Sequence, residues 1–167
     1  MITLKNVLVA TDFGEPAGAA LTYGRALAHA FGARLHVLHV VEEVYISSYG
    51  SEFYIPPDPN VQNEVDAAAR KQLDSLLIDS DGSGPLTEGV LRHSNSASQA
   101  IVEYAKAAAI DLIVMGTHGR MGVAHLLLGS VAERVVRTAS CPVLTVHHPE
   151  HEFVLPDALA AAAAVRA

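Results

Sequence analysis

The chain has 167 residues, half of them apolar and only 17% charged, and it contains no tryptophan. This balance is typical of one compact α/β domain and excludes a largely disordered chain. Eleven basic residues against eighteen acidic ones give a net charge of −7, so we do not expect a broad nucleic-acid-binding face. An anionic ligand would therefore have to be bound by local geometry.

Short apolar runs rich in β-branched residues alternate with segments of helical periodicity along the chain. We expect strands at residues 5–11, 33–41, 86–93, 111–116 and 141–148. We expect helices at 16–31, at about 60–79, between 94 and 110, and over about ten residues ending near 140. Ser96 or its serine and asparagine neighbours mark the start of the third helix. This alternation predicts a parallel sheet with helices on both faces, with ligands at the carboxyl ends of the strands.

Two segments fall outside this alternation. Residues 42–59 are rich in tyrosine and proline and break the rhythm, so we expect a mobile connection there. The end of the chain, from residue 149, is rich in alanine and is either weakly helical or disordered. We therefore place one domain at residues 1–148 and a tail at 149–167.

The single cysteine, Cys141, rules out an internal disulfide and a cysteine-rich zinc site. It precedes a proline at the start of an apolar run, which favours a buried structural thiol over a reactive one. The N-terminus carries no basic stretch leading into an apolar segment, and no apolar run reaches the roughly 20 residues that span a bilayer. We therefore expect a cytoplasmic protein that has no membrane partner.

The segment VMGTHGRMGVAHLLLGSV, residues 114–131, joins a predicted strand end to a predicted helix start. Gly116 and Gly119 permit a positive φ and, without a Cβ, let an anion approach backbone N–H groups. Gly129 and Ser130 stand at the expected helix start, whose N–H groups and positive dipole end favour phosphate. The alternative is that the glycines only form a turn. The full spacing between a strand and a helix favours a phosphate site.

No lysine accompanies these glycines. A Walker-type loop places its lysine on the β- and γ-phosphates, where it promotes phosphoryl transfer. Here Arg120 is the nearby cation, and Asp12, at the end of the first strand, is the strand-end carboxylate expected at the same edge. Asp12 either orients a ribose or binds a magnesium ion. The loop is therefore expected to hold a nucleotide with little means of cleaving it.

The spacing G-x-x-G, nine residues and G-S, from Gly116 through Ser130, resembles the ATP-binding branch of the universal stress protein family. The resemblance extends to VLVATDFG, LHVLHVV, DLIVMGTHG and CPVLTVH, and it covers about residues 5–147. It implies a Rossmann-like, adenine nucleotide alpha hydrolase-like fold, with an open five-stranded parallel sheet in the order 3-2-1-4-5. It also implies a nucleotide-responsive regulatory or protective factor in the stress response, with little or no turnover.

The resemblance also assigns roles to residues near the nucleoside. Asp12 is expected at the nucleoside, Ala10 and Thr11 are expected to line the base or ribose pocket, and the Val40 backbone is expected at the adenine edge. ATP is the implied ligand, with Mg²⁺ or Mn²⁺ on its phosphates, near Asp12, and no metal ligated by the protein alone. The residues implied at the ribose and the phosphates are Met115, Gly116, Thr117, His118, Gly119, Arg120, Gly129, Ser130 and Val131.

The family resemblance further implies a homodimer that pairs through the fifth strand, Pro142 to Val146. Two features depart from the family pattern: Gly14 stands where members often have serine, and residues 45–59 are not a family signature. Two other functions remain open, a slow ATP hydrolase or phosphoryl-transfer enzyme and a dimeric interaction protein that binds no nucleotide. No catalytic residue is assigned.

Nine histidines raise the hypothesis of a metal site, which their positions do not favour. His36 and His39 lie three apart on a strand, so we expect them on opposite faces of the sheet. His147, His148 and His151 are expected at an exposed end of the chain. His118 lies inside the glycine loop, where it either shapes the loop near phosphate or is simply exposed.

Overall fold

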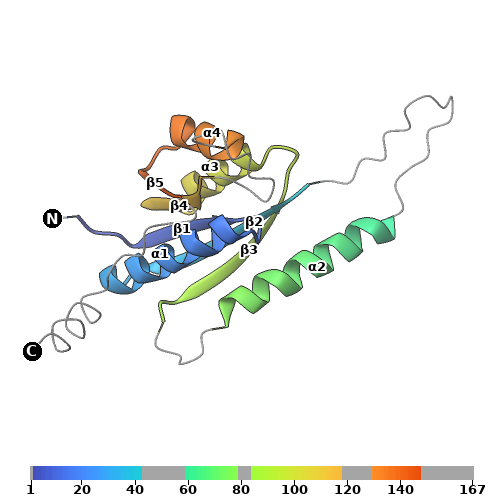
Figure 1. The fold of residues 1–167 in the computed structure, drawn as a ribbon, viewed down its shortest axis with the longest axis horizontal. Helices are drawn as coiled ribbons and strands as arrows, with labels where there is room; N and C mark the ends of the chain where they lie inside the picture. Colours follow the sequence, from blue (N-terminus) through green and yellow to red (C-terminus); the bar gives the residue numbers. More distant parts are fainter. Residues whose placement is uncertain (1, 43–58, 79–83, 118–128, 148–167) are drawn as a thin grey trace, which may run out of the picture.

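The computed structural model describes residues 2–42, 59–78, 84–117 and 129–147. Strands and helices alternate along these ranges, as predicted (Figure 1). In chain order they are β1 (Asn6–Thr11), α1 (Glu15–Phe31), β2 (Arg34–Val41), α2 (Pro59–Leu77), β3 (Thr87–His93), α3 (Ala97–Ala107), β4 (Leu112–Gly116), α4 (Ser130–Thr138) and β5 (Val143–Val146). Residues 43–58, most of the predicted connection, and 148–167, which include the predicted tail, lie outside the described ranges.

One predicted boundary and one predicted helix cap need a physical correction. β5 begins at Val143 and not at residue 141, because Pro142 has no N–H to donate, although its carbonyl accepts the Ile113 N–H at 3.0 Å. Ser96 does precede α3, but its side chain makes no capping hydrogen bond. Instead, the Ser94 hydroxyl oxygen accepts the Ser96 N–H at 3.1 Å. The start of α3 was therefore predicted correctly, but the capping was not.

The five strands form one parallel sheet in the order β3-β2-β1-β4-β5, which confirms the predicted order. From β1 the chain moves outward through β2 to β3, and it then crosses back to β4 and β5 on the other side of β1. The strand order therefore reverses between β1 and β4. Ligands of doubly wound sheets bind at the carboxyl ends of the strands beside such a reversal.

Helices cover both faces of the sheet, α1 and α2 on one and α3 and α4 on the other (Figure 1). Alternate residues of β1 enter two separate apolar layers, because successive side chains of a strand point to opposite faces. The layer beneath α1 and α2 includes Val7, Val9, Ala20, Leu21, Leu35, Val37, Leu73 and Val114. The layer beneath α3 and α4 includes Leu8, Ala10, Leu38, Ile101, Tyr104, Ile113, Met115 and Val135.

The first helix packs closely on the central strand because it contains a glycine at the contact. A Cβ at Gly24 would lie 2.2 Å from Cγ2 of Val9, which is fully buried in β1. A Cβ at Gly18, in the same helix, would have no neighbouring atom within 4 Å. Gly32 ends the helix in the left-handed conformation, with φ of 62°. One of these glycines therefore provides space, and another provides a backbone conformation.

A histidine is buried within the layer beneath α3. His36 is 5% exposed, and its Nδ1 lies 2.8 Å from the Tyr104 hydroxyl. His39 lies on the other face of β2, as predicted, where it packs against Phe13. Burial lowers the pKa of His36; Glu88 opposes this shift and Arg34 adds to it. The neutral form of His36 is therefore favoured in the folded protein.

Cys141 is half-buried against the same layer, and burial raises the pKa of its thiol. The structure thus agrees with an unreactive thiol, although Cys141 is less buried than predicted. Within the described ranges, no helix combines the length and the apolar character that a membrane crossing requires.

We expect Gly24→Ala to lower the free energy of unfolding by about 1–3 kcal/mol, because the new methyl overlaps the side chain of Val9. Gly18→Ala is the matched control and should raise it by about 0.5–1 kcal/mol, because alanine favours the helix at a position with open space. Urea unfolding of the three proteins measures both effects. Equal stabilisation by the two substitutions would contradict the close contact.

We expect His36 to make stability depend on pH. The unfolded chain binds the proton near the ordinary pKa of 6.5, and the folded chain binds it less readily. The free energy of unfolding should therefore fall as the pH decreases from about 6.5 towards the folded pKa, by about 1.4 kcal/mol per unit of difference between the two pKa values. In His36→Asn this dependence should be smaller, whereas His29→Ala, an exposed control in α1, should keep it. Urea unfolding between pH 7.5 and 5 measures it; parallel curves for wild type and His36→Asn would refute the assignment.

Candidate functional site

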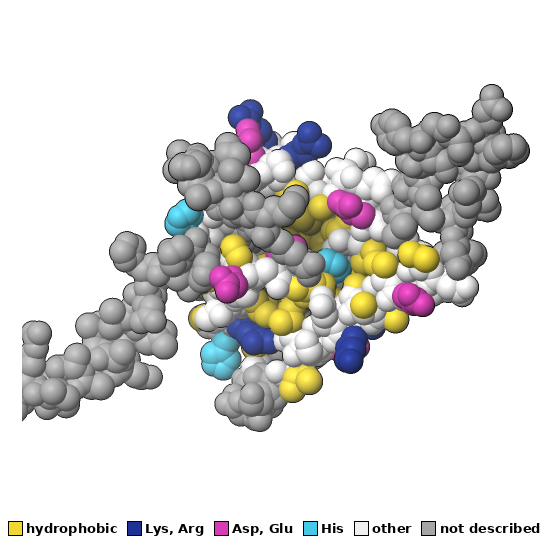
Figure 2. All heavy atoms as spheres, turned by 45° about the vertical axis from the view of Figure 1, so that its right-hand side comes forward, with side chains coloured by type: hydrophobic (Ala, Val, Ile, Leu, Met, Phe, Trp, Pro, Cys, Tyr) yellow, Lys and Arg dark blue, Asp and Glu magenta, His cyan; other side chains and the backbone are white. Residues whose placement is uncertain are grey.

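The two segments predicted to share a site come together at the carboxyl edge of the sheet. Ala10 of β1 is paired in register with Met115 of β4, so the residues that follow the two strands are neighbours. Figure 2 brings this edge of the sheet forward and shows apolar side chains gathered near the middle of the view, with a histidine among them. The edge thus combines the reversal of strand order with an apolar surface.

Two local hydrogen bonds hold the turn between β1 and α1. The Thr11 hydroxyl oxygen accepts the Phe13 N–H, and Oδ1 of Asp12 accepts the Gly14 N–H, both at 3.0 Å. Phe13 adopts a left-handed conformation, with φ of 65°. Residues other than glycine rarely adopt this conformation, and such strain is often found at functional sites. The half-buried Asp12 carboxylate is therefore held in a defined position at the end of β1.

Gly116, at the end of β4, packs against the first turn of α1. A Cβ at this position would lie 2.9 Å from the Cβ, the carbonyl carbon and the carbonyl oxygen of Pro16. Among the glycines in the described ranges, only Gly32 has a positive φ. Gly116 therefore does not use the positive φ that glycine permits, and its contribution is the missing Cβ. Gly116 is needed because α1 lies too close to the strand for any side chain.

The two halves of the glycine motif meet at one hydrogen bond. The Gly129 N–H donates to the Thr117 carbonyl at 2.6 Å, and the Thr117 N–H donates to the Val146 carbonyl at 2.9 Å. The Thr117 hydroxyl also lies 3.2 Å from Nδ1 of His147. These contacts tie the start of α4 to the ends of β4 and β5. The residues predicted to bind phosphate at the two ends of the motif are therefore close together.

The helix α4 begins at Ser130, as predicted, and Gly129 is its N-cap residue. Gly129 has φ of −68° and ψ of 155°, an extended conformation open to any residue, so its conformation alone does not require glycine. Ser130 and Val131 are exposed in the first turn. The N–H groups of a first turn have no partner within the helix and lie at its positive end. This helix end is suited to bind an anion.

The backbone of Val40 also lies at this edge. The Arg34 N–H donates to the Lys5 carbonyl beside β1, and the Leu35 N–H donates to the Leu86 carbonyl beside β3. Along β2, the backbone groups of successive residues therefore point alternately towards β1 and β3. This alternation turns the Val40 backbone towards β1. Because Thr11, the last residue of β1, pairs with His39, Val40 lies just beyond the end of β1. Its backbone therefore lies at the carboxyl edge of the sheet.

The predicted site residues differ in how accessible they are. Ala10, Thr11, Met115 and Thr117 are buried, so their side chains leave little surface for a ligand. The half-buried or exposed residues at this edge are Asp12, Val40, Gly116, Gly129, Ser130 and Val131. Three predicted residues, His118, Gly119 and Arg120, lie outside the described ranges. Sequence reasoning did not assign Phe13, Pro16 or His39 to this edge; the signals were the predicted strand ends near Phe13 and His39 and the predicted helix start at Pro16.

The model of the universal stress protein family matches residues 3–147. This chain belongs to the universal stress protein family. Universal stress protein A homolog 1 of Coxiella burnetii is 34% identical over 146 residues, which cover 85% of this chain and 95% of the relative.

Solved structures of the family share the fold of this universal stress protein. Protein MJ0577 of Methanocaldococcus jannaschii is 27% identical, with a TM-score of 0.71 over 90% of this chain and 100% of that one. A universal stress protein from Archaeoglobus fulgidus, solved in complex with dAMP, is 22% identical, with a TM-score of 0.60 over 87% of this chain and 99% of that one. The likeness to the second structure shows the fold alone.

We expect Gly116→Ala to lower the free energy of unfolding by about 1–3 kcal/mol, because the new methyl would meet the Pro16 backbone, which cannot turn aside as a side chain can. Thermal or urea unfolding beside Gly18→Ala, which introduces the same methyl into open space, measures this cost. Unchanged stability in Gly116→Ala would show that α1 does not approach β4 this closely.

Proposed function

We propose that this universal stress protein binds ATP between the carboxyl ends of β1 and β4 and acts in the cytoplasm as a nucleotide-responsive regulatory or protective factor. The observation that carries the proposal is the hydrogen bond from the Gly129 N–H to the Thr117 carbonyl. It places the N-terminus of α4 beside the strand ends, where the strand order reverses. Two features that favour a nucleotide therefore coincide at one edge.

In this proposal each part of the nucleotide has its own partners. The first turn of α4, with Gly129, Ser130 and Val131, holds the phosphate chain together with His118, Gly119 and Arg120 of the glycine loop. Asp12 contacts the ribose, and the Val40 backbone contacts the adenine. A universal stress protein of the same fold, from Archaeoglobus fulgidus, was solved with an adenine nucleotide, dAMP.

The binding energy must come from many contacts. Micromolar binding corresponds to about 8 kcal/mol. A helix terminus contributes about 0.3–1 kcal/mol, and up to about 2 kcal/mol when it is partly buried. Adenine burial, backbone hydrogen bonds and neutralisation of the phosphates have to provide the rest.

A divalent cation fits this site best when the phosphates carry it. The described ranges contain no group of three His, Cys, Asp or Glu side chains that could hold a metal ion. We therefore propose that Mg²⁺ or Mn²⁺ binds to the phosphates, with Asp12 as the carboxylate of the protein at this edge. The ion would neutralise phosphate charge in a protein whose net charge is −7.

We further propose that the protein holds ATP with little or no turnover. Oδ1 of Asp12 already accepts the Gly14 N–H, and the glycine loop contains no lysine. The first of these holds the carboxylate in the turn, and the second leaves the loop without the cation that promotes phosphoryl transfer in a Walker-type loop.

We also propose a homodimer that pairs through β5. This strand is at the edge of the sheet, and Leu144 on it is 36% exposed. Val136 on the neighbouring helix α4 is 47% exposed. An edge strand with exposed apolar side chains tends to pair with another chain.

We expect the protein to bind ATP with micromolar affinity and to release adenine nucleotide when it is denatured. Calorimetric titration of ATP, ADP and AMP, with and without Mg²⁺, tests this, together with chromatography of the released molecules. In Gly129→Val the extended backbone suits valine, so the fold should persist, but the branched side chain should obstruct the phosphates and remove ATP binding.

Gly18→Ala is the matched control and should bind ATP as the wild type does. No released nucleotide and no binding at millimolar concentration would refute the proposal. Unchanged affinity in Gly129→Val would refute the assignment of the loop. Turnover of about one per second that is lost in Asp12→Ala would support the hydrolase alternative.

A further inference from the structure

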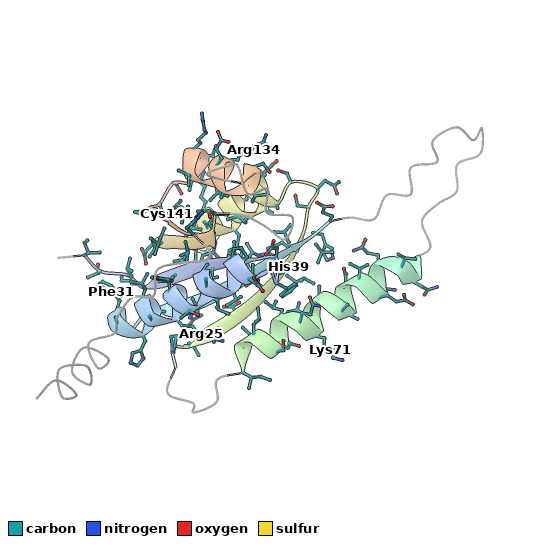
Figure 3. All side chains as sticks on the ribbon, viewed as in Figure 1. Arg25, Phe31, His39, Lys71, Arg134 and Cys141 are labelled. Atoms are coloured by element: carbon teal, nitrogen blue, oxygen red, sulfur yellow. The ribbon has the colours of Figure 1, made fainter. Side chains whose placement is uncertain are left out.

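The side chain of His39 closes the end of the central strand pair. Its Nδ1 lies 2.8 Å from the carbonyl oxygen of Thr11, the last residue of β1 and the register partner of His39 in β2. A carbonyl oxygen only accepts hydrogen bonds, so Nδ1 carries the hydrogen. The imidazole therefore donates to β1 where the strand ladder ends. Figure 3 labels His39 at this end of the strands, near the N-terminal end of α1.

The same ring packs against the strained residue of the following turn. The ring centroids of His39 and Phe13 are 4.2 Å apart, with an angle of 37° between the ring planes. Phe13 has a φ of 65°, which a residue with a large side chain keeps only when its surroundings hold it. His39 thus contacts the turn at two points, the Thr11 carbonyl before Asp12 and the Phe13 ring after it.

The two residues that His39 contacts, Thr11 and Phe13, flank Asp12 in the sequence. Its carboxylate accepts the Gly14 N–H, so its orientation depends on the conformation of Phe13 between them. If Phe13 relaxed to a negative φ, the peptide groups on either side of it would rotate, and the Asp12 carboxylate would move with them. The Thr11 hydroxyl, which accepts the Phe13 N–H, opposes this relaxation from within the turn. His39 opposes it from the neighbouring strand.

We propose that His39 is a positioning residue of the nucleotide site: it holds Phe13 in its strained conformation and thereby orients Asp12 towards the nucleoside. The ligand in this inference rests on the proposed function, whereas the claim that His39 holds the turn at Phe13 does not. His39 also directly precedes Val40, so one residue links the proposed ribose and adenine contacts. A residue that acts on the nucleoside should affect AMP and ATP alike, whereas α4 acts on the phosphates.

The test separates the two contacts of His39. His39→Asn places an amide donor where Nδ1 lies but removes the ring, and His39→Phe keeps a ring but removes the donor. His39→Ala removes both contacts and should weaken AMP and ATP binding by the same factor, about tenfold or more. His39→Asn and His39→Phe should each recover part of this loss. His29→Ala, an exposed histidine of α1, is the matched control and should bind as the wild type does.

A second substitution tests whether His39 acts through Phe13. Glycine adopts a positive φ without strain, so Phe13→Gly leaves little for His39 to hold. In the Phe13→Gly background, His39→Ala should therefore cost less than about threefold in AMP affinity, because positioning effects that share one residue are not additive. An undiminished loss in this background would refute the role of Phe13.

Amide hydrogen exchange tests the structural part without a ligand. The Phe13 and Gly14 amides, which donate to the side chains of Thr11 and Asp12, should lose protection in His39→Ala and regain part of it in His39→Asn. Wild type that binds no nucleotide would overturn the proposed function, and exchange would still decide whether His39 holds the turn. Unchanged protection, or AMP affinity within twofold of a wild type that binds, would overturn the positioning role, even if His39→Ala lowered the stability.

Discussion

The hydrogen bond from the Gly129 N–H to the Thr117 carbonyl determines how the rest of this edge is built. It returns the chain to the end of β4 after the glycine loop, so that α4 begins beside the strand that the loop has just left. The Thr117 N–H also donates to the Val146 carbonyl, and this second hydrogen bond holds the end of β5 beside the end of β4. The helix terminus and the ends of β4 and β5 thus meet through backbone hydrogen bonds.

The first helix, α1, packs closely on two strands of the sheet because a glycine stands at each of the two contacts. Gly24 lets α1 approach β1 at Val9, and Gly116 lets the first turn of α1 approach β4 at Pro16. The helix is therefore positioned against both strands that border the reversal of strand order. The turn containing Asp12 joins β1 to this helix, so its geometry depends on core packing as well as on its own hydrogen bonds.

The order of elements could be predicted from the sequence because strands and helices differ in apolar periodicity, and the opposite faces of His36 and His39 followed from the same rule. Periodicity says which face a side chain takes, but not which group it meets. The contacts of His39 with Thr11 and Phe13 depend on the register of β1 and β2, which no local pattern reveals. The role of Gly116 was predicted only in part for a related reason: a glycine in the sequence indicates backbone freedom or a missing side chain, and only the position of Pro16 distinguishes them.

The acidic character of the chain explains why a proposed anion site here would use the backbone. With a net charge of −7, the overall field opposes a polyphosphate, so attraction has to come from dipoles within a few ångströms of the ligand. A helix N-terminus supplies such dipoles without a titratable group, and the hydrogen bond from the Gly14 N–H holds the Asp12 carboxylate in place. An edge that bound ATP through fixed geometry would accelerate its cleavage only if it held the transition state more tightly than the intact ATP. In the proposed function, occupancy of this edge by ATP, and not cleavage of the ATP, would be the signal that the protein carries.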